Sequence, residues 1–392
     1  ILVRFDLGLL GVIDHGDKSA EQAILVHAAR VDQLAVPVGH VRAAVAHIGG
    51  AIGHDVRRLN DADALYVHRI EDVQRVAQKY LQKENRSVAI ATLDPDRAFG
   101  PSAFGPLQFR AVDGGVTGDW QPLATLVRLP AARTPRGAVL YVHGFVDYFF
   151  QRHMALRFAQ EGYAFYALDL RKHGRSLLAH QHPCYCRRLD EYDPEISRAL
   201  AEIGEPVLLA GHSTGGLICS LYAARGERRG QLRALWLNSP FFEFNAHGLA
   251  RLKLRLAIGL GRRRPFLNNP HALRPQYVKS LHRDYGGEWN FDLRLKPVEG
   301  FPAYFGWLGA IADAHARVHA GLALELPVLA MHSDEADIVL DWRQVARWSR
   351  TLGQRVTVLG FPGGLHDLVL SRAEVREEVF RQLFAWAERA EA

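Results

Sequence analysis

The chain has 392 residues, of which 48% are hydrophobic and 23% are charged. This composition excludes fibrous and intrinsically disordered proteins, and the length exceeds the roughly 250–300 residues that one core supports, so we expect one large and one small domain. The net charge of +6 comes from scattered basic residues. We therefore expect no nucleic-acid partner, while a weak attraction to anionic lipid surfaces is compatible with this charge.

The three cysteines, Cys184, Cys186 and Cys219, form no even disulfide framework, which favours a reducing compartment. No apolar run reaches the roughly 18 residues that a membrane span needs. The start of the chain lacks the features of a signal peptide, so we expect a cytoplasmic protein. The first residue is Ile rather than Met, which leaves an upstream targeting segment open.

The first hundred residues show two helical patterns. Apolar residues recur at helical spacing between 21 and 47, and again from Ile70 to Leu81, which a strand-like segment at 87–91 follows. Residues 93–106 then contain several Pro and Gly without periodicity, which is typical of a linker. We therefore expect a small α+β segment at 1–97, a linker at 98–107 and a large domain at 108–392.

The segment from Ile70 to Ala91 resembles the C-terminal end of an insulinase/pitrilysin-type zinc peptidase domain. That family binds zinc through H-x-x-E-H, and neither this string nor H-E-x-x-H occurs in the chain. The resemblance therefore implies a non-catalytic fragment without a metal site.

From residue 108 strands alternate with helices, which predicts an α/β fold with a mostly parallel sheet and helices on both faces. The expected strands are Ala138–Val142, Ala164–Leu170, Pro206–Ala210, Leu232–Asn238, Pro327–His332 and Val356–Phe361. The expected helices are 149–161, 194–203, 215–225, 342–352 and 373–388. The interval from 243 to about 322 is too long for a bare connection, so we expect a lid insert there.

One motif indicates a nucleophile. The string Gly211-His212-Ser213-Thr214-Gly215 follows an apolar strand and leads into a helix, which is the context of the G-x-S-x-G nucleophile elbow. In that elbow the small residues permit a strained turn that exposes the serine hydroxyl. Ser213 is therefore the expected nucleophile, and the alternative is a glycine-rich turn with an inert serine.

A serine hydroxyl needs a base and an acid that orients the base. His366 lies in a glycine-rich loop after the last strand, where this fold places the base. After the preceding strand come three aspartates, Asp334, Asp337 and Asp341. Asp341 opens a helix and is expected to cap it, and Asp334 lies almost on the strand. We therefore expect Asp337 to be the acid.

The oxyanion of a tetrahedral intermediate needs preorganised donors. The string Tyr141–Phe145 runs from the end of a strand into a His-Gly turn, so the backbone N–H groups of Phe145 and Thr214 are the expected pair. The insert is rich in aromatic and basic residues, and we expect Trp289, Phe305 and Trp307 to bind an acyl chain. The alternative is that these aromatic residues only pack the lid on the core.

Residues 106–392 resemble the serine-aminopeptidase-type, monoglyceride-lipase/lysophospholipase-like branch of the α/β-hydrolases. The strings that carry the resemblance are His143–Phe150, Ala164–Ser176, Gly211–Gly215, Leu237–Pro240 and Gly363–Ser371. The resemblance implies a serine hydrolase of carboxylic esters such as monoacylglycerols or lysophospholipids. Two departures leave the substrate open: Lys172 replaces a usual Gly, and the loop bearing the acid has an unusual length.

Two other functions stay open at this point. The same branch contains proline iminopeptidase-like enzymes, so the substrate could be a small peptide or amide. A decayed hydrolase fold could instead serve as a non-catalytic binding protein. We expect no cofactor and a small-molecule ester or lipid as the partner, and the sequence does not specify an oligomeric state.

Overall fold

The computed structural model describes residues 2–5, 9–12, 108–112, 124–131, 136–270, 275–335 and 337–391. The chain divides into two units, 1–100 and 101–392. In the first unit, β1 (Leu2–Phe5) pairs antiparallel with β2 (Leu9–Val12). The helices expected at 21–47 and 70–81 and the strand expected at 87–91 lie outside the described residues.

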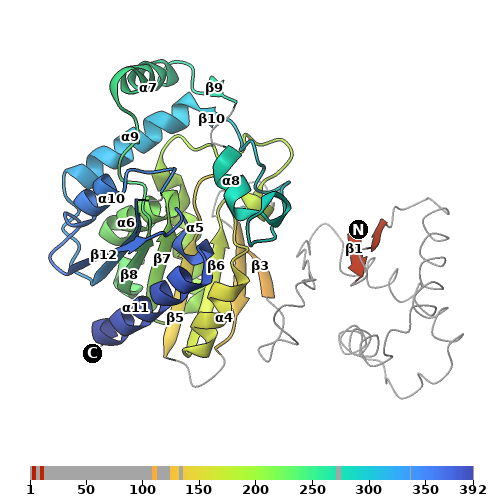
Figure 1. Ribbon diagram of the computed structural model, residues 1–392, viewed down its shortest axis with the longest axis vertical. Helices are drawn as coiled ribbons and strands as arrows, with labels where there is room; N and C mark the ends of the chain where they lie inside the picture. Colours follow the sequence, from red (N-terminus) through yellow and green to blue (C-terminus); the bar gives the residue numbers. More distant parts are fainter. Residues whose placement is uncertain are drawn as a thin grey trace, which may run out of the picture. The chain divides into compact units, whose positions relative to one another are not determined.

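The second unit is built on an eight-stranded sheet in the order β12-β11-β8-β7-β5-β6-β4-β3 (Figure 1). Its strands are β3 (Gln108–Val112), β4 (Ala124–Leu129), β5 (Gly137–Val142), β6 (Tyr163–Asp169), β7 (Val207–His212), β8 (Leu232–Asn238), β11 (Val328–Asp334) and β12 (Val356–Pro362). The last six are parallel, whereas β4 runs antiparallel to β6 and β3 antiparallel to β4. The mostly parallel α/β sheet is thus confirmed.

All six expected strands are present, with ends that differ by at most two residues from the expected ones. Strands β3 and β4 were not expected from the sequence. These two strands lie antiparallel at one edge, and no helix of the described chain separates them. The alternation of strand and helix that revealed the parallel strands is therefore absent here.

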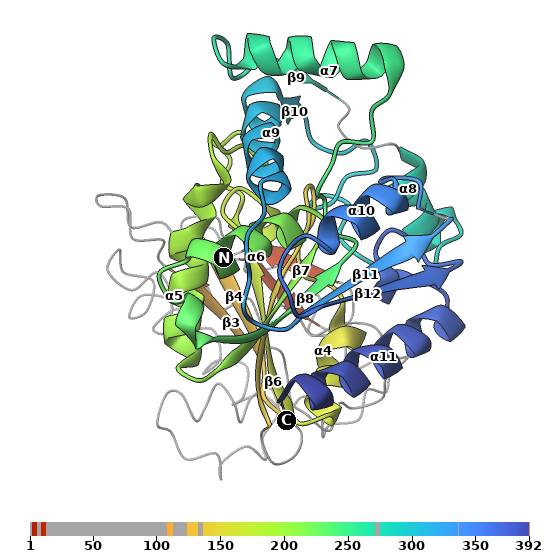
Figure 2. The ribbon, with the colours of Figure 1, turned by 90° about the vertical axis from the view of Figure 1, so that its left-hand side faces the viewer.

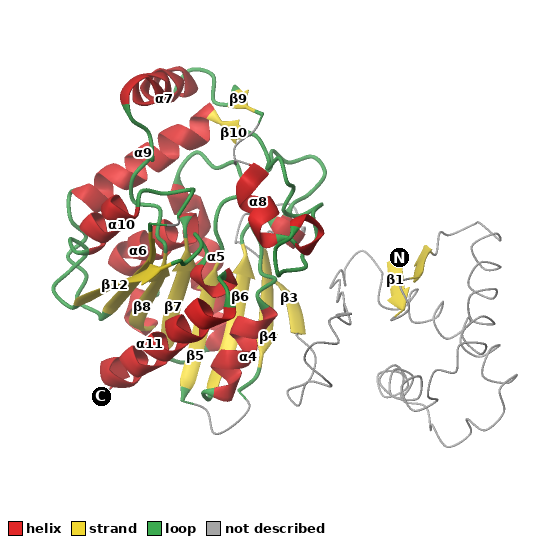
Figure 3. Ribbon diagram, viewed as in Figure 1, coloured by secondary structure: helices red, strands yellow, loops and turns green. Residues whose placement is uncertain are grey.

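Helices cover both faces of the sheet, as expected (Figures 1 and 3). One face packs on α4 (Arg152–Gln160) and α11 (Ala373–Glu391), and the other on α5 (Asp193–Ile203) and α6 (Thr214–Arg225). Alternate residues of β5 divide between the two cores, because successive side chains of a strand point to opposite faces. A further helix, α10 (Trp342–Ser349), contacts β11. The short 3-10 helices outside the insert are η5 (Gly174–Ser176), η6 (Leu189–Tyr192), η7 (Arg229–Gln231) and η9 (Leu368–Leu370).

The expected insert lies between β8 and β11. In its described part it contains α7 (Gly248–Gly261), β9 (Asn268–Asn269), α8 (Pro275–Leu281), η8 (Arg283–Tyr285), β10 (Ala303–Tyr304) and α9 (Phe305–His319). Figure 2 shows α9 between α7 and the helices and strands of the main domain. Buried residues of α9 belong to the same core as α6, so the insert is packed on the end of the sheet where β8 finishes.

Candidate active site

Ser213 lies in the tight turn between β7 and α6. Its backbone has φ 52° and ψ −117°, which is a strained conformation for a residue with a side chain. A Cβ atom on Gly211 would lie 2.6 Å from the Gly215 carbonyl oxygen, and one on Gly215 would lie 2.3 Å from that of Val142. Only glycine therefore fits at either position, and the expected strained elbow is confirmed.

His366 lies in the loop that follows β12 and reaches both other members of the expected triad. Its Nε2 is 3.0 Å from Ser213 Oγ, and its Nδ1 is 2.8 Å from Asp337 Oδ2. A carboxylate only accepts hydrogen bonds, so Nδ1 carries the proton and Nε2 accepts from the serine hydroxyl. The imidazole is thus held in the tautomer that a general base requires.

The carboxyl group of Asp337 is buried and fully engaged. Oδ1 accepts hydrogen bonds from the N–H groups of Val339 at 2.7 Å and Leu340 at 3.0 Å, while Oδ2 faces His366. Burial alone would raise the pKa of Asp337, but the His366 ring and the two N–H groups hold this pKa below its usual value. Asp337 therefore stays ionised.

The two other aspartates of this region have different partners. Asp341 caps α10 and accepts a hydrogen bond from the N–H of Arg343 at 3.0 Å, as expected. Asp334, at the end of β11, lies 3.5 Å from His332 Nδ1. Neither carboxylate has a hydrogen bond to His366 among the contacts of the described residues.

The expected oxyanion donors lie on either side of Ser213. Thr214 is the first residue of α6, so its N–H has no acceptor within the helix. The turn that carries Phe145 approaches closely, because a Cβ on Gly144 would lie 3.2 Å from Ser213 Cβ. His143 fixes this turn: Nδ1 donates to the Gly144 oxygen at 2.8 Å, and Nε2 accepts from the Leu170 N–H at 3.0 Å.

Two residues without an expected role connect the nucleophile turn to the His366 loop. The backbone oxygen of Asn238 accepts a hydrogen bond of 3.0 Å from the Ser213 N–H. The Asn238 side chain donates a hydrogen bond of 2.7 Å to Asp367 Oδ1. Asp367 also accepts from Gln151 Nε2 at 3.1 Å. The sequence carried a signal for both residues, because Asn238 and Asp367 each lie in one of the strings that carry the family resemblance.

The loop after β6 shapes the site through its polar side chains. Asp169 accepts from the N–H of Phe149 at 2.8 Å and from the Arg175 guanidinium at 2.6 Å. His173 is buried, and this burial lowers its pKa to about 3, so it stays neutral. Lys172, which replaces a usual Gly, has φ 62°, and its ammonium donates to the Tyr185 oxygen at 3.0 Å.

The three aromatic residues expected to bind substrate have different surroundings. Trp307 is buried and stacks on Phe145 with 4.0 Å between ring centroids, so it lies beside an expected oxyanion residue. Phe305 begins α9 and donates its backbone N–H to the Leu267 oxygen at 2.7 Å. Trp289 stacks on His153 at 4.2 Å and donates its indole N–H to the Leu370 oxygen at 2.7 Å. The contacts of Trp289 favour packing.

The insert also reaches the site through a buried ion pair that the sequence did not reveal. Lys296 Nζ lies 2.7 Å from Asp147 Oδ1, and both side chains are only 2% exposed. Burial would raise the pKa of Asp147, but the ammonium of Lys296 holds it below its usual value. Tyr277 packs between the pair and the base: its ring is 5.5 Å from Lys296 Nζ and 5.5 Å from the His366 ring.

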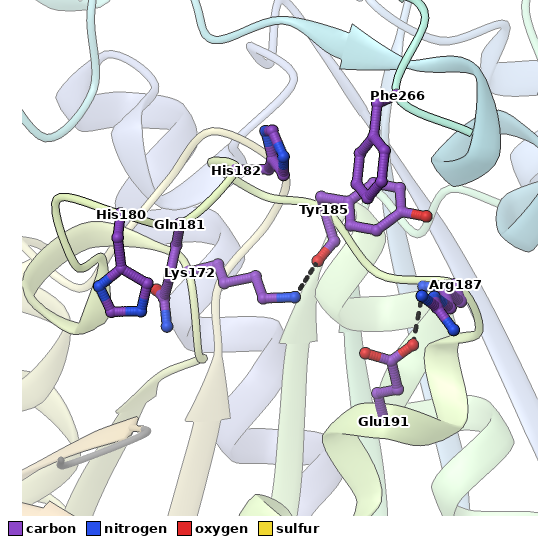
Figure 4. A pocket seen from close by; sticks show the side chains of 8 residues that line it. All are labelled: Lys172, His180, Gln181, His182, Tyr185, Arg187, Glu191 and Phe266. Atoms are coloured by element: carbon purple, nitrogen blue, oxygen red, sulfur yellow. Dashed lines mark hydrogen bonds between the residues drawn. The ribbon is translucent and has the colours of Figure 1, made fainter. Parts of the chain in front are cut away.

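A cavity of about 370 Å³ lies beside the loops after β6 (Figure 4). Its lining residues are Lys172, His180, Gln181, His182, Tyr185, Arg187, Glu191 and Phe266. This lining includes neither Ser213 nor His366. Phe266, which follows α7, stacks on His182 with 4.5 Å between the rings, so one wall of the cavity comes from the insert.

No group of three or more His, Cys, Asp or Glu side chains in the described part of the chain is arranged to hold a metal ion. Among the same residues, no helix combines the length and the apolar character of a membrane span.

Comparison with known proteins agrees with this fold. Over 139 residues, 33% of this chain, the sequence is 35% identical to a monoacylglycerol lipase of Mycolicibacterium smegmatis and covers 47% of it. The match thus spans about half the length of this curated relative.

Two solved structures share the architecture of the second unit. One is a soluble variant of monoglyceride lipase from Saccharomyces cerevisiae (TM-score 0.58, 18% identity, 72% of this chain and 96% of that chain). The other is a monoacylglycerol lipase of Paleococcus ferrophilus (TM-score 0.55, 23% identity, 68% of this chain and 99% of that chain). Residues 133–372, more than half of the chain, match the serine aminopeptidase, S33 family. The chain therefore belongs to this family and has the α/β-hydrolase fold.

Proposed function

We propose that the protein is a serine hydrolase that cleaves carboxylic esters, with Ser213, His366 and Asp337 as its catalytic triad. The observation that supports this most strongly is the continuous path of hydrogen bonds from Asp337 through His366 to Ser213. The stability of the fold alone does not require a strained elbow, a buried acid and a correctly oriented base to occur together. Together they activate a hydroxyl.

The reaction follows from this geometry. Ser213 Oγ attacks the ester carbonyl carbon while its proton moves to His366 Nε2, and the N–H groups of Phe145 and Thr214 stabilise the oxyanion. His366 then gives the proton to the leaving alcohol, and the C–O bond breaks to leave an acyl-enzyme. Water attacks this acyl group with His366 again as the base, which releases the acid and restores Ser213. Asp337 stabilises the imidazolium in both halves.

We propose a monoacylglycerol-like or lysophospholipid-like ester with a medium or long acyl chain as the substrate. The names of the curated relative and of the two similar structures support an acylglycerol. The apolar surface that Trp307 and Phe145 form beside Ser213 suits an acyl chain better than an acetyl group.

A substrate series tests this function. Values of kcat/KM are measured for p-nitrophenyl esters of rising chain length, for monoacylglycerols, for lysophospholipids and for aminoacyl amides. We expect a rise from acetate to medium chains and little turnover of amides. Equal kcat/KM across chain length would contradict the acyl-chain site, and faster turnover of aminoacyl amides would favour the peptidase alternative.

We also propose that residues 1–97 are a non-catalytic fragment. The absence of both zinc-peptidase motifs from the sequence supports this. A chain that begins near Gly105 should keep the esterase activity, and chelators should not inhibit the full chain. Loss of activity on truncation would instead assign these residues a part in the site or its stability.

A further inference from the structure

The outer face of α7 carries a row of exposed leucines. Leu249, Leu252, Leu256 and Leu260 are between 44% and 66% exposed. Each residue turns the helix by about 100°, so these positions fall within about 80° of arc and form one stripe. Large leucines this exposed are unusual when they gather on one surface, and such patches mark interaction sites. We call these four residues the α7 stripe.

Exposed cations border the α7 stripe. They are Arg251, Lys253 and Arg255 on the helix and Arg262, Arg263 and Arg264 directly after it. None of these six forms an ion pair with another residue that the structure describes. The sequence contains no Asp or Glu between Glu243 and Asp284, although it contains nine Lys or Arg there. The segment that carries the stripe is therefore strongly positive.

The opposite side of α7 is packed against the rest of the insert. The helix packs against α9, and Gly261 lies so close that a Cβ there would be 2.3 Å from the Phe305 oxygen. Figures 1 and 2 both show α7 at the outer end of the hydrolase unit, with α9 beneath it. The stripe therefore faces away from the core that α9 joins. No other part of the described insert covers it.

We propose that the α7 stripe and its six cations dock the protein on the surface of an anionic lipid bilayer. A helix with an apolar face and basic flanks lies in the plane of the membrane, with its leucines in the acyl boundary and its cations at the headgroups. At 14 residues α7 is too short to span a bilayer, which needs about 20. The charge of the segment selects anionic lipid over a neutral surface and over a second copy of this cationic helix.

The docked orientation also places the site close to the lipid. Trp307, near the start of α9, stacks on Phe145, whose N–H is the proposed oxyanion donor. The pair α7 and α9 thus stands between the bilayer and the elbow that bears Ser213. A substrate that partitions into the membrane would leave it next to this end of the sheet, but the docking itself does not depend on the esterase activity.

Vesicle co-sedimentation of the full chain tests the docking without any activity measurement. The vesicles are pure phosphatidylcholine, or phosphatidylcholine with about one quarter phosphatidylglycerol, in about 0.1 M salt and in about 0.5 M salt. One variant replaces Leu252 and Leu256 by Ser, and a second carries Arg262→Gln, Arg263→Gln and Arg264→Gln. The matched control carries Arg228→Gln, Arg229→Gln and Arg355→Gln, three exposed residues that precede β8 and β12 at the other end of the sheet.

We expect the native chain to bind anionic vesicles and to lose most of this binding at high salt. Loss of three cations should lower the partition coefficient on the order of 100-fold, and the leucine variant should lower it at least about tenfold. The control, with the same net charge as the arginine variant, should bind like the native chain. Because all substituted side chains are exposed, every variant should keep its Tm.

Three results would overturn the proposal. The first is no binding of the native chain to anionic vesicles. The second is equal binding by the native chain and either α7 variant, or equal loss in the control, which would leave only the net charge. The third is a native dimer that the leucine variant converts to a monomer in light scattering without any vesicle binding, which would make the stripe an interface between copies of this chain.

Discussion

The loops at the ends of the sheet strands and the insert between β8 and β11 contribute to the same site in different ways. Ser213, His366 and Asp337 each lie within a few residues of a strand end, and their positions follow from local sequence patterns. The insert reaches the site through Tyr277, Lys296 and Trp307, whose contacts join residues far apart in the sequence. The comparison separates the residues that we propose to react from residues of the insert that pack against them.

The largest effect should come from the nucleophile, if the strand-end loops carry the chemistry. Ser213→Ala should lower kcat for a p-nitrophenyl ester about 10⁶-fold, as removal of the nucleophile does in other serine triads. The fold should be kept, because Ala fits where Ser does. The check is steady-state kinetics together with Tm. Residual activity within tenfold of the native value would show that another group attacks the ester.

The acid gives the next largest effect. Asp337→Asn should lower kcat about 10⁴-fold, because an amide favours the wrong tautomer of His366. The matched controls are Asp334→Asn and Asp341→Asn, whose carboxylates bind His332 and the N–H of Arg343. Each should change kcat by less than about tenfold, and Asp341→Asn should cost little stability because Asn also caps helices. A large loss for Asp334→Asn with normal turnover for Asp337→Asn would redraw the triad.

The same comparison explains what the sequence could predict. The six parallel strands, the elbow at Ser213 and the loops bearing His366 and Asp337 follow from alternation, glycine spacing and capping preferences, all of which are local. The antiparallel β3 and β4 have no crossover helix between them among the described residues, and nothing near Lys296 in the sequence indicates Asp147 as its partner. Trp289 shows the same limit, because aromatic composition does not tell a packing residue from a binding one.

The buried ion pair tests whether the insert holds the site in place. Lys296→Met should destabilise the protein by about 3–5 kcal/mol, because it leaves the Asp147 carboxylate buried without its cation. The double variant Lys296→Met with Asp147→Asn should recover much of this loss, since no charge is then stranded. Urea unfolding of the two variants measures the difference. Equal stability of the single and double variants would mean that the pair does not anchor the insert.

A smaller effect is expected at the contact of the insert with α4. Burial lowers the pKa of His153 from 6.5 in the unfolded chain to about 4 in the folded one. Between these two pH values the unfolded chain therefore binds more protons than the folded chain does. Stability is therefore present above about pH 6.5 and is lost as the pH falls. His153→Gln keeps a donor for the Val369 oxygen but does not titrate. When the pH falls from about 7 to about 5, this variant should therefore lose about 2 kcal/mol less free energy of unfolding than the native chain.

Urea unfolding at the two pH values measures this difference. The variant His180→Gln, in which an exposed histidine receives the same substitution, is measured in parallel as the control. The same loss of stability in the native chain and in His153→Gln would show that this histidine does not couple the packing of Trp289 to pH.

Covalent labelling with a fluorophosphonate tests the central claim most directly, because such a probe reacts preferentially with an activated serine. Mass spectrometry of the labelled full chain should show one adduct, on the peptide that contains Ser213. Ser213→Ala should abolish the adduct and Asp337→Asn should slow its formation greatly. An unlabelled native chain, or an adduct on another residue, would contradict the assignment of Ser213 as the nucleophile of an ester hydrolase.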